Sequence, residues 1–202
     1  MALSLLLDSA DPDAWDEWLP SGLFQGVTTN PTLLRRAARP CRLDELERLT
    51  HGALAPGRVL VKLPITLSGA EAGRRLIDTG VPVTFTACYE VHQVLLAAAL
   101  GARYIAPYLG RIGDLGRDGH ADLIAMQRAL EGVDATTRLL VASLRHPSDL
   151  SRLTAAGVTC FTLAPAVVAE LFSAAPTAEA AAQFERDAAA AGEANSGALP
   201  AR

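Results

Sequence analysis

The chain has 202 residues, of which 50% are hydrophobic and 20% are charged. A chain of this length and composition can bury roughly 70% of its unfolded surface in one globular domain and is too apolar to be disordered. Its 18 basic and 22 acidic residues give a net charge of −4, without the basic excess that nucleic-acid binders usually carry. We therefore expect a folded domain with no nucleic-acid partner.

No stretch of the sequence has the length of a membrane span. The longest apolar run, residues 91–100, is far below the roughly 20 residues that a spanning helix needs. The apolar start of the chain lacks the basic segment and the cleavage site of a signal peptide. Cys41, Cys88 and Cys160 are odd in number and form no CxxC pair, which predicts neither disulfides nor a zinc site. We expect a cytoplasmic protein with no membrane partner.

Short apolar runs alternate with helix-like segments along the chain, which is the pattern of repeated βα units around a parallel sheet. Polar or small residues follow nearly every run. In a βα barrel such positions lie at the carboxyl ends of the strands, where active sites are built. Seven runs are predicted as strands: residues 3–7, 26–28, 59–63, 81–85, 104–106, 139–142 and 159–163.

Helices are predicted between these strands. Pro31 suits the first position of a helix, and Gly80, Gly101 and Gly157 suit the residue that follows one. The spacing of apolar residues and these caps predict helices over residues 13–18, from residue 31, and over residues 43–51, 68–78, 90–100, 121–130 and 147–156.

The end of the chain has a different composition. Residues 177–191 are Ala-rich with Phe184 as their only large apolar side chain, and we predict a helix there that lies across the barrel. Residues 192–202 mix Gly, Ser, Asn and Pro, which is typical of a disordered tail. The expected organisation is therefore a single domain of residues 1–191 followed by this tail.

Lys62 is the only lysine among the 18 basic residues, and apolar residues flank it on both sides. A lone lysine in an arginine-rich chain indicates a task that a guanidinium cannot perform. Burial lowers the pKa of an amine, which makes the neutral nucleophile of a Schiff base available near neutral pH. The alternative is a lysine whose stem lies along apolar surface with its head group in water. The residues alone leave both interpretations open.

A carboxylate and an amide follow two adjacent predicted strands, at Asp8 and Asn30. Such groups suit the hydroxyls of a polyol, although Asp and Asn are also common helix N-caps. Hydroxyl side chains follow three further strands, and an arginine comes soon after two of them. Arginines beside hydroxyls and helix N-termini suit a phosphate group, although solvated surface arginines are equally common. These residues are Thr86, Tyr108, Ser143, Arg111 and Arg145.

None of the four histidines has metal-ligand spacing with another, and the chain has no glycine-rich phosphate loop. We therefore predict neither a metal nor a nucleotide cofactor.

Five motifs resemble, in the same order, those of the small transaldolases and fructose-6-phosphate aldolases. They are LDSAD at 7–11, GVTTNP at 26–31, VKLPIT at 61–66, APY at 106–108 with RI at 111–112, and AS at 142–143. They cover residues 3 to about 188, and the TTNP run followed by VKLP is specific. The resemblance implies a class I aldolase on a TIM-type βα barrel, which passes a dihydroxyacetone unit of a sugar phosphate through a lysine Schiff base without a metal.

The resemblance also implies a role for each matching residue. Lys62 matches the Schiff-base lysine, whereas Asp8 and Asn30 match residues that hold the hydroxyls of the donor and assist proton transfer. Thr86 matches the threonine that positions the catalytic water. Tyr108 matches the general acid/base of the aldolase branch. The resemblance further implies that Thr28 lines the donor pocket and that Arg111 and Ser143 bind the phosphate, with Arg145 beside them.

One part of the family pattern is absent. The family has a further βα unit between the TTNP helix and the lysine strand, and this unit carries a Gln or Glu that orients the catalytic water. Only 31 residues separate Asn30 from Lys62, which is too few for that unit at usual element lengths. We therefore predict a barrel of seven strands without the third βα unit. Gln25 and Glu71 are the nearest candidates to replace the missing side chain.

A barrel of seven strands closes only if the tilt and stagger of the strands change. Otherwise a neighbouring chain or the C-terminal helix covers the open edge. Because an exposed sheet edge favours association, we expect a homo-oligomer.

Three functions fit these residues. The first is an aldolase or transaldolase that acts on sugar phosphates. The second is a relative that keeps the imine but uses another substrate, in specialised sugar or secondary metabolism. The third is a noncatalytic relative that binds phosphosugars. A binding relative is expected to lose Lys62 early, so that its presence favours the two enzymes.

Overall fold

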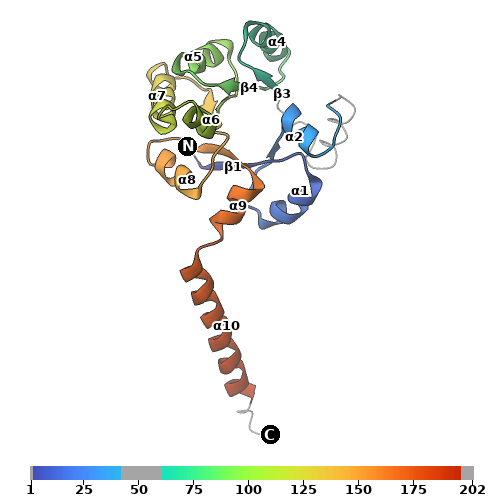
Figure 1. Cartoon of the computed structure of the whole chain (residues 1–202), viewed down its shortest axis with the longest axis vertical. Coiled ribbons are helices and arrows are strands. Elements are labelled where there is room, and N and C mark those ends of the chain that lie inside the picture. The colour runs from blue at the N-terminus through green and yellow to red at the C-terminus, as the bar shows by residue number, and fades with distance from the viewer. Residues whose placement is uncertain (1, 42–60, 197–202) are drawn as a thin grey trace.

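The computed structural model describes residues 2–41 and 61–196, which form an α/β body and one long helix that extends from it (Figure 1). Each of the seven predicted runs overlaps a strand, and all strand pairs are parallel. Residues 59 and 60 of the third run lie outside the described residues. The strands are β1 (Ser4–Asp8), β2 (Val27–Thr28), β3 (Val61–Pro64), β4 (Val83–Cys88), β5 (Tyr104–Pro107), β6 (Arg138–Leu139) and β7 (Cys160–Leu163).

The strands form two hydrogen-bonded groups, ordered β2-β1-β7 and β3-β4-β5-β6. A parallel bridge between Val141 and Phe161 joins the groups. There the Val141 amide donates to the Cys160 carbonyl and the Thr162 amide donates to the Val141 carbonyl, both at 2.9 Å. The described strands therefore follow the order β3-β4-β5-β6-β7-β1-β2. The predicted absence of a third βα unit concerns residues 42–60, which lie outside the described residues.

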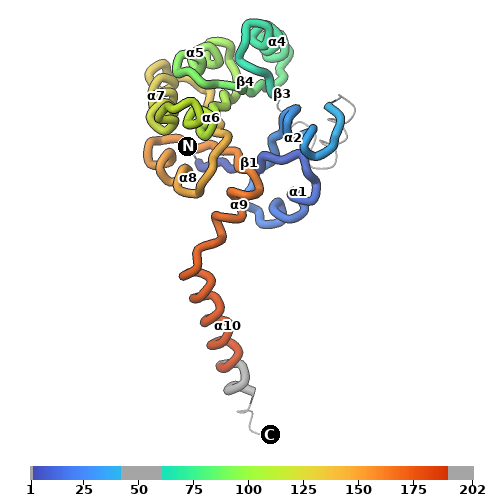
Figure 2. The backbone as a smooth tube through the Cα atoms, in the orientation of Figure 1, coloured from blue at the N-terminus to red at the C-terminus, as the bar shows by residue number. Residues whose placement is uncertain are grey.

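Helices connect the strands and lie on the outside of the sheet, as the continuous path of the chain in Figure 2 illustrates. The predicted helices are α1 (Pro12–Trp18), α2 (Pro31–Arg36), α4 (Leu67–Asp78), α5 (Val91–Leu100), α7 (Gly119–Gly132) and α8 (Pro147–Thr154). The predicted helical segment 43–51 lies outside the described residues. No helix of the described part is long and apolar enough to cross a membrane.

Two short helices were not expected from the sequence. They are α6 (Leu109–Asp114), which contains two glycines, and α9 (Pro165–Leu171). Neither has enough turns to produce a recognisable apolar period. Because both begin directly after β5 and β7, they bring helix N-termini to the carboxyl ends of these strands.

The core has two layers because side chains alternate between the two faces of each strand. Leu7, Phe85 and Phe161 belong to the larger cluster, which the strands form with residues of the surrounding helices. A smaller cluster of buried residues on the other face consists of Leu6, Tyr104, Ala106, Leu140 and Cys160. We call this second face, turned away from the helices, the inner face.

Gly69 allows α4 to pack closely against β3. A Cβ atom at Gly69 would overlap the carbonyl oxygen of Pro64, whereas one at Gly132 in α7 would meet no described atom within 4 Å. We expect Gly69→Ala to lower the free energy of unfolding by about 2 kcal/mol, because two backbone segments must separate. Gly132→Ala adds the same methyl group and should leave stability unchanged or raise it by about 0.5 kcal/mol. Chemical denaturation compares the two, and equal losses would contradict the close approach.

The prediction that the C-terminal helix lies across the barrel is wrong. α10 (Ala175–Ser196) points away from the body (Figures 1 and 2). Residues 173–190 are exposed apart from the half-buried Ala182, and Phe184 is 70% exposed. The physical reason is that this Ala-rich helix has little apolar surface to bury. The helix also continues beyond the expected boundary at residue 192, and residues 197–202 lie outside the described part.

Candidate active site

Strand register brings several of the predicted site residues to one face of the sheet. Lys62 on β3 pairs with Thr84 on β4, and Pro64 pairs with Thr86. Because side chains alternate along a strand, Thr84 and Thr86 lie on the same face as Lys62. Thr84 also pairs with Tyr104, whose side chain belongs to the inner face. Lys62 therefore lies on the inner face, within a layer of threonine hydroxyls.

Lys62 is partly buried, and the surrounding protein lowers the pKa of its amine below the usual value of 10.5. The main cause is desolvation of the ammonium group, which the negative charge of Asp8 opposes in part. The electrostatic effect of Asp8 also links the end of β1 to Lys62 on β3, although these strands are not paired. This environment favours the neutral amine, which is the form that attacks a carbonyl group.

Asp8 is held by a short chain of hydroxyl groups on the inner face. Asp8 pairs in register with Thr28 on β2, and the Thr28 hydroxyl donates to Asp8 Oδ1 at 2.5 Å. Thr28 Oγ1 also lies 2.6 Å from Thr162 Oγ1. Since the Thr28 proton is directed to the carboxylate, Thr162 is the donor to Thr28. Asp8 is therefore not a helix cap, and the N-cap of α1 is Asp11.

Two residues of this layer were missed from the sequence. Thr162 is 1% exposed and Thr84 is 3% exposed. Both lie inside apolar runs that were interpreted as strand interior. For Thr84 the available signal was its spacing: it lies two residues before Thr86 in the same strand, and therefore on the same face.

Thr86 and Tyr108 form a second pair of hydroxyls. Their oxygen atoms lie 2.8 Å apart, and Thr86 is 9% exposed. The Tyr108 ring is held on two sides: the Tyr89 ring meets it edge-on at 5.7 Å between centroids, and the Arg111 guanidinium lies 4.7 Å from its centroid. The structure therefore brings together the two residues that were predicted to handle water and protons.

Asn30 is the N-cap of α2, as the alternative interpretation predicted. Its Oδ1 accepts from the amides of Thr32 and Leu33 at 2.9 and 3.1 Å. This cap uses the side-chain oxygen, so that the amide nitrogen remains a suitable donor to a ligand hydroxyl. Thr29, beside it, has a buried Oγ1 with no hydrogen-bond partner among the described residues.

The predicted phosphate residues lie around the start of α6. The Gly110 amide donates to the Ser143 carbonyl at 2.9 Å, which holds the segment after β6 against the helix that carries Arg111. Arg111 and Arg145 are both exposed. Arg145 pairs with Asp114 at 2.5 Å, so that its charge is partly compensated, whereas the described contact of Arg111 is the ring of Tyr108.

Neither candidate for the missing water-orienting residue lies near Lys62. Gln25 is exposed and contacts the Ser4 hydroxyl and, at 3.5 Å, the Leu3 carbonyl, both at the amino end of β1. Glu71 is exposed on α4. The prediction that one of them replaces the missing side chain is therefore wrong, because Gln25 is at the opposite end of the strands and Glu71 faces solvent.

The sequence of the chain is similar to those of known proteins. A family model described as Transaldolase/Fructose-6-phosphate aldolase matches residues 46–198. Proteins named "Probable transaldolase" from Hyphomonas neptunium and Caulobacter sp. (strain K31) are 32% and 34% identical to it. These alignments cover 85% and 95% of this chain and 90% and 99% of the relatives.

Among solved structures, a cube-shaped, highly porous protein cage designed by fusing symmetric oligomeric domains shares the fold, with a TM-score of 0.54 and 16% sequence identity. The match covers 98% of this chain and 80% of that chain. The family match shows that the chain belongs to the transaldolase/fructose-6-phosphate aldolase family, whose fold is a TIM-type α/β barrel. The chain is thus an enzyme of the transaldolase/aldolase type.

Proposed function

We propose that this chain is a class I aldolase or transaldolase in which Lys62 forms an imine with the ketone of a sugar phosphate. The observation that carries the proposal is the environment of Lys62: a single lysine on the inner face, with a pKa lowered by burial and with the Asp8 carboxylate acting on it. A snorkelling lysine would keep its ammonium group in water, and its pKa would then not be lowered by desolvation.

In the proposed reaction the neutral amine of Lys62 adds to the donor carbonyl, and loss of water gives a protonated imine. A base then removes the proton of the hydroxyl next to the bond to be broken. The carbon–carbon bond breaks, an aldehyde leaves, and the electron pair of the broken bond moves into the imine to give an enamine. The enamine carbon then takes up a proton in an aldolase, or adds to an acceptor aldehyde in a transaldolase, which restores the protonated imine. Tyr108 is the proposed acid and base for these proton transfers. Thr86, 2.8 Å from it, positions the water that later hydrolyses the imine.

The remaining site residues are proposed to bind substrate. Asp8 and Asn30 hold the hydroxyls of the donor, and Thr28, which donates to Asp8, lines the same pocket. Arg111 and Ser143, with Arg145 beside them, bind the phosphate group. The proximity of the Ser143 segment to α6 supports a shared phosphate site, because charge-assisted bonds need donors that converge on one group.

We also propose that the body, which is the part of the predicted domain 1–191 that precedes α10, forms one barrel of seven strands without the third βα unit. The alignment with the Caulobacter protein spans 215 positions, more than the 202 residues of this chain, so that the relative contains residues without a counterpart here. A homo-oligomer is proposed because Phe172, just before α10, and Phe184 on α10 are 62% and 70% exposed, and a second copy of the chain would cover these two apolar side chains.

The test of the function is chemical trapping of the imine. Dihydroxyacetone and fructose 6-phosphate are each incubated with the protein and sodium borohydride, which reduces an imine to a stable secondary amine. A three-carbon adduct on the peptide that contains Lys62 is expected with dihydroxyacetone. An unchanged mass with every ketose and ketose phosphate would support a noncatalytic binding protein instead. Trapping that persists in Lys62→Arg would exclude Lys62 as the nucleophile.

A further inference from the structure

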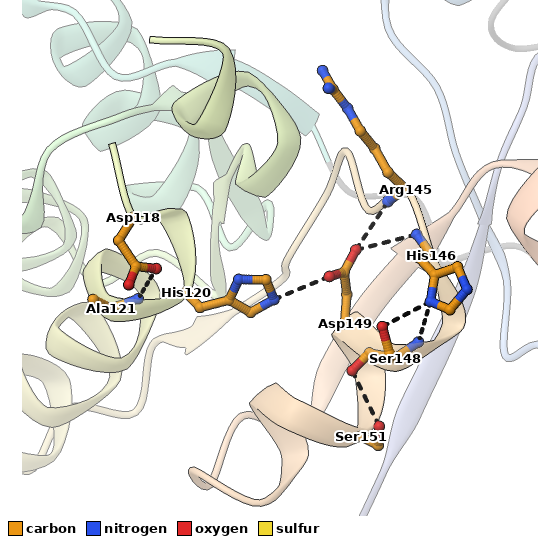
Figure 3. Close-up of polar contacts among 8 residues, drawn as sticks. All are labelled: Asp118, His120, Ala121, Arg145, His146, Ser148, Asp149 and Ser151. Atoms are coloured by element: carbon orange, nitrogen blue, oxygen red, sulfur yellow. Dashed lines mark hydrogen bonds and ion pairs between the residues drawn. The ribbon is translucent and has the colours of Figure 1, made fainter. Parts of the chain in front are cut away.

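A polar network holds the segment that follows β6, at residues 143–146 (Figure 3). Asp149, on the first turn of α8, directs Oδ2 to this segment, where it accepts from the amides of Arg145 and His146 at 3.1 and 3.2 Å. The Arg145 side chain points away from Asp149 in Figure 3 and pairs with Asp114. Asp149 therefore fixes the backbone of this segment through two amide groups, while the Arg145 side chain contacts Asp114.

The same segment is held from its other side by α6. Ser143 has a φ of 60°, a left-handed conformation that is uncommon for a non-glycine residue and needs support from its surroundings. The Gly110 amide provides one contact, to the Ser143 carbonyl. A Cβ atom at Gly110 would lie 2.6 Å from that carbonyl oxygen and from Arg145 Nε, so that the approach requires glycine.

His120 adds a contact that a helix cap alone does not require. Its Nε2 lies 3.0 Å from Asp149 Oδ1, and the side chains are 20% and 14% exposed. His120 belongs to the first turn of α7, whereas Asp149 belongs to α8. One oxygen of Asp149 would be enough to close the capping box with His146. The second oxygen connects the segment to a neighbouring helix, which fixes the direction of the whole carboxylate.

We propose that Asp149 and His120 are positioning residues for the phosphate site, which keep Ser143 and Arg145 in the geometry that binds a phosphate group. This inference rests on the proposed function, because it assumes that residues 143–146 receive the phosphate of the substrate. It adds two residues that do not touch the substrate. Because N–H donors contact both carboxylate oxygens of Asp149, its side chain is held in one orientation between α7 and the 143–146 segment.

The test uses the full chain and inorganic phosphate, with affinity measured by calorimetry and by the phosphate-induced rise in Tm. Asp149→Ala and His120→Ala are expected to weaken phosphate binding by about tenfold, because loss of positioning contacts spreads the donors over many geometries. Trapping of dihydroxyacetone at Lys62 should stay at the wild-type level, since this donor carries no phosphate. In turnover, KM for fructose 6-phosphate should rise while kcat changes little.

Ser151→Ala is the matched control, because Ser151 lies on the same helix and donates to the Ser148 carbonyl within it at 3.1 Å. Equal weakening in this control, unchanged phosphate affinity in both test variants, or no phosphate binding by the wild type would each overturn the inference. So would an equal loss of dihydroxyacetone trapping, which indicates general distortion of the site. If Asp149→Ala does not fold, the phosphate affinity of His120→Ala tests the inference, because this variant leaves the cap of α8 intact.

The proposed function and the inference about Asp149 and His120 can be rejected by different results. A wild-type protein that binds phosphate but never traps dihydroxyacetone would not be a Schiff-base enzyme. The role of Asp149 and His120 would still be decided by phosphate affinity alone.

Discussion

Replacement of Lys62 by methionine is expected to lower turnover by at least about 10³-fold and to stabilise the fold at neutral pH. The loss of activity follows from the loss of the imine-forming amine. The gain in stability follows from the lowered pKa, because folding moves an ammonium group into surroundings that disfavour its charge. Methionine has a similar length and no charge to desolvate.

The sign of the pH dependence follows from proton binding. Between the lowered pKa of the folded protein and 10.5, the unfolded chain binds a proton at Lys62 that the folded chain has released. The free energy of unfolding of the wild type therefore rises with pH through this window. The advantage of Lys62→Met should be largest below the lowered pKa and should vanish as the pH approaches 10.5. Denaturation curves of both proteins over this pH range measure it.

Two results would contradict this account of Lys62. A variant that is less stable than the wild type at every pH would indicate that the amine is solvated in the folded protein. A difference in stability that does not change with pH would indicate a packing effect of the new side chain.

Tyr108→Phe is expected to lower the rate of carbon–carbon bond cleavage by about 10²-fold, because the general acid and base is removed. The ring contacts with Tyr89 and Arg111 remain, so that the fold should be retained. Imine trapping at Lys62 should persist. The measurement is single-turnover cleavage of fructose 6-phosphate beside borohydride trapping.

Tyr89→Phe removes a phenolic hydroxyl from the neighbouring ring and is the control for Tyr108→Phe. It should leave both rates unchanged. If Tyr108→Phe instead prevents trapping but leaves cleavage of the remaining imine unaffected, Tyr108 acts in imine formation and not in cleavage of the bond.

The fold could be predicted best at buried positions, because burial restricts them to apolar residues. Buried parallel strands are continuous apolar runs, so the seven strand positions were visible, and proline and glycine marked most helix ends. α6 and α9 could not be predicted, because elements of six and seven residues have too few turns to reveal a period. The direction of α10 relative to the body could not be predicted either, because an Ala-rich helix has no large apolar face that specifies where it packs.

The site could be predicted in part. Lys62 was found because it is unique in composition, and Asp8 and Thr86 because polar residues at strand ends interrupt apolar runs. Thr162 was missed because its role depends on the register between β1 and β7, which no local pattern reports. Asp149 and His120 were missed for a related reason: their contact joins two helices that lie side by side only in the folded chain.

The exposure of α10 has a consequence for the energetics of the whole chain. The described side chains of α10, residues 175–190, are exposed apart from Ala182, so that this helix takes its order mainly from its own backbone hydrogen bonds, and its helicity depends on temperature. In a single copy of the chain its helix–coil equilibrium is therefore largely independent of the unfolding of the body. The chain then consists of two cooperative units, and a single free energy of unfolding describes only the larger one.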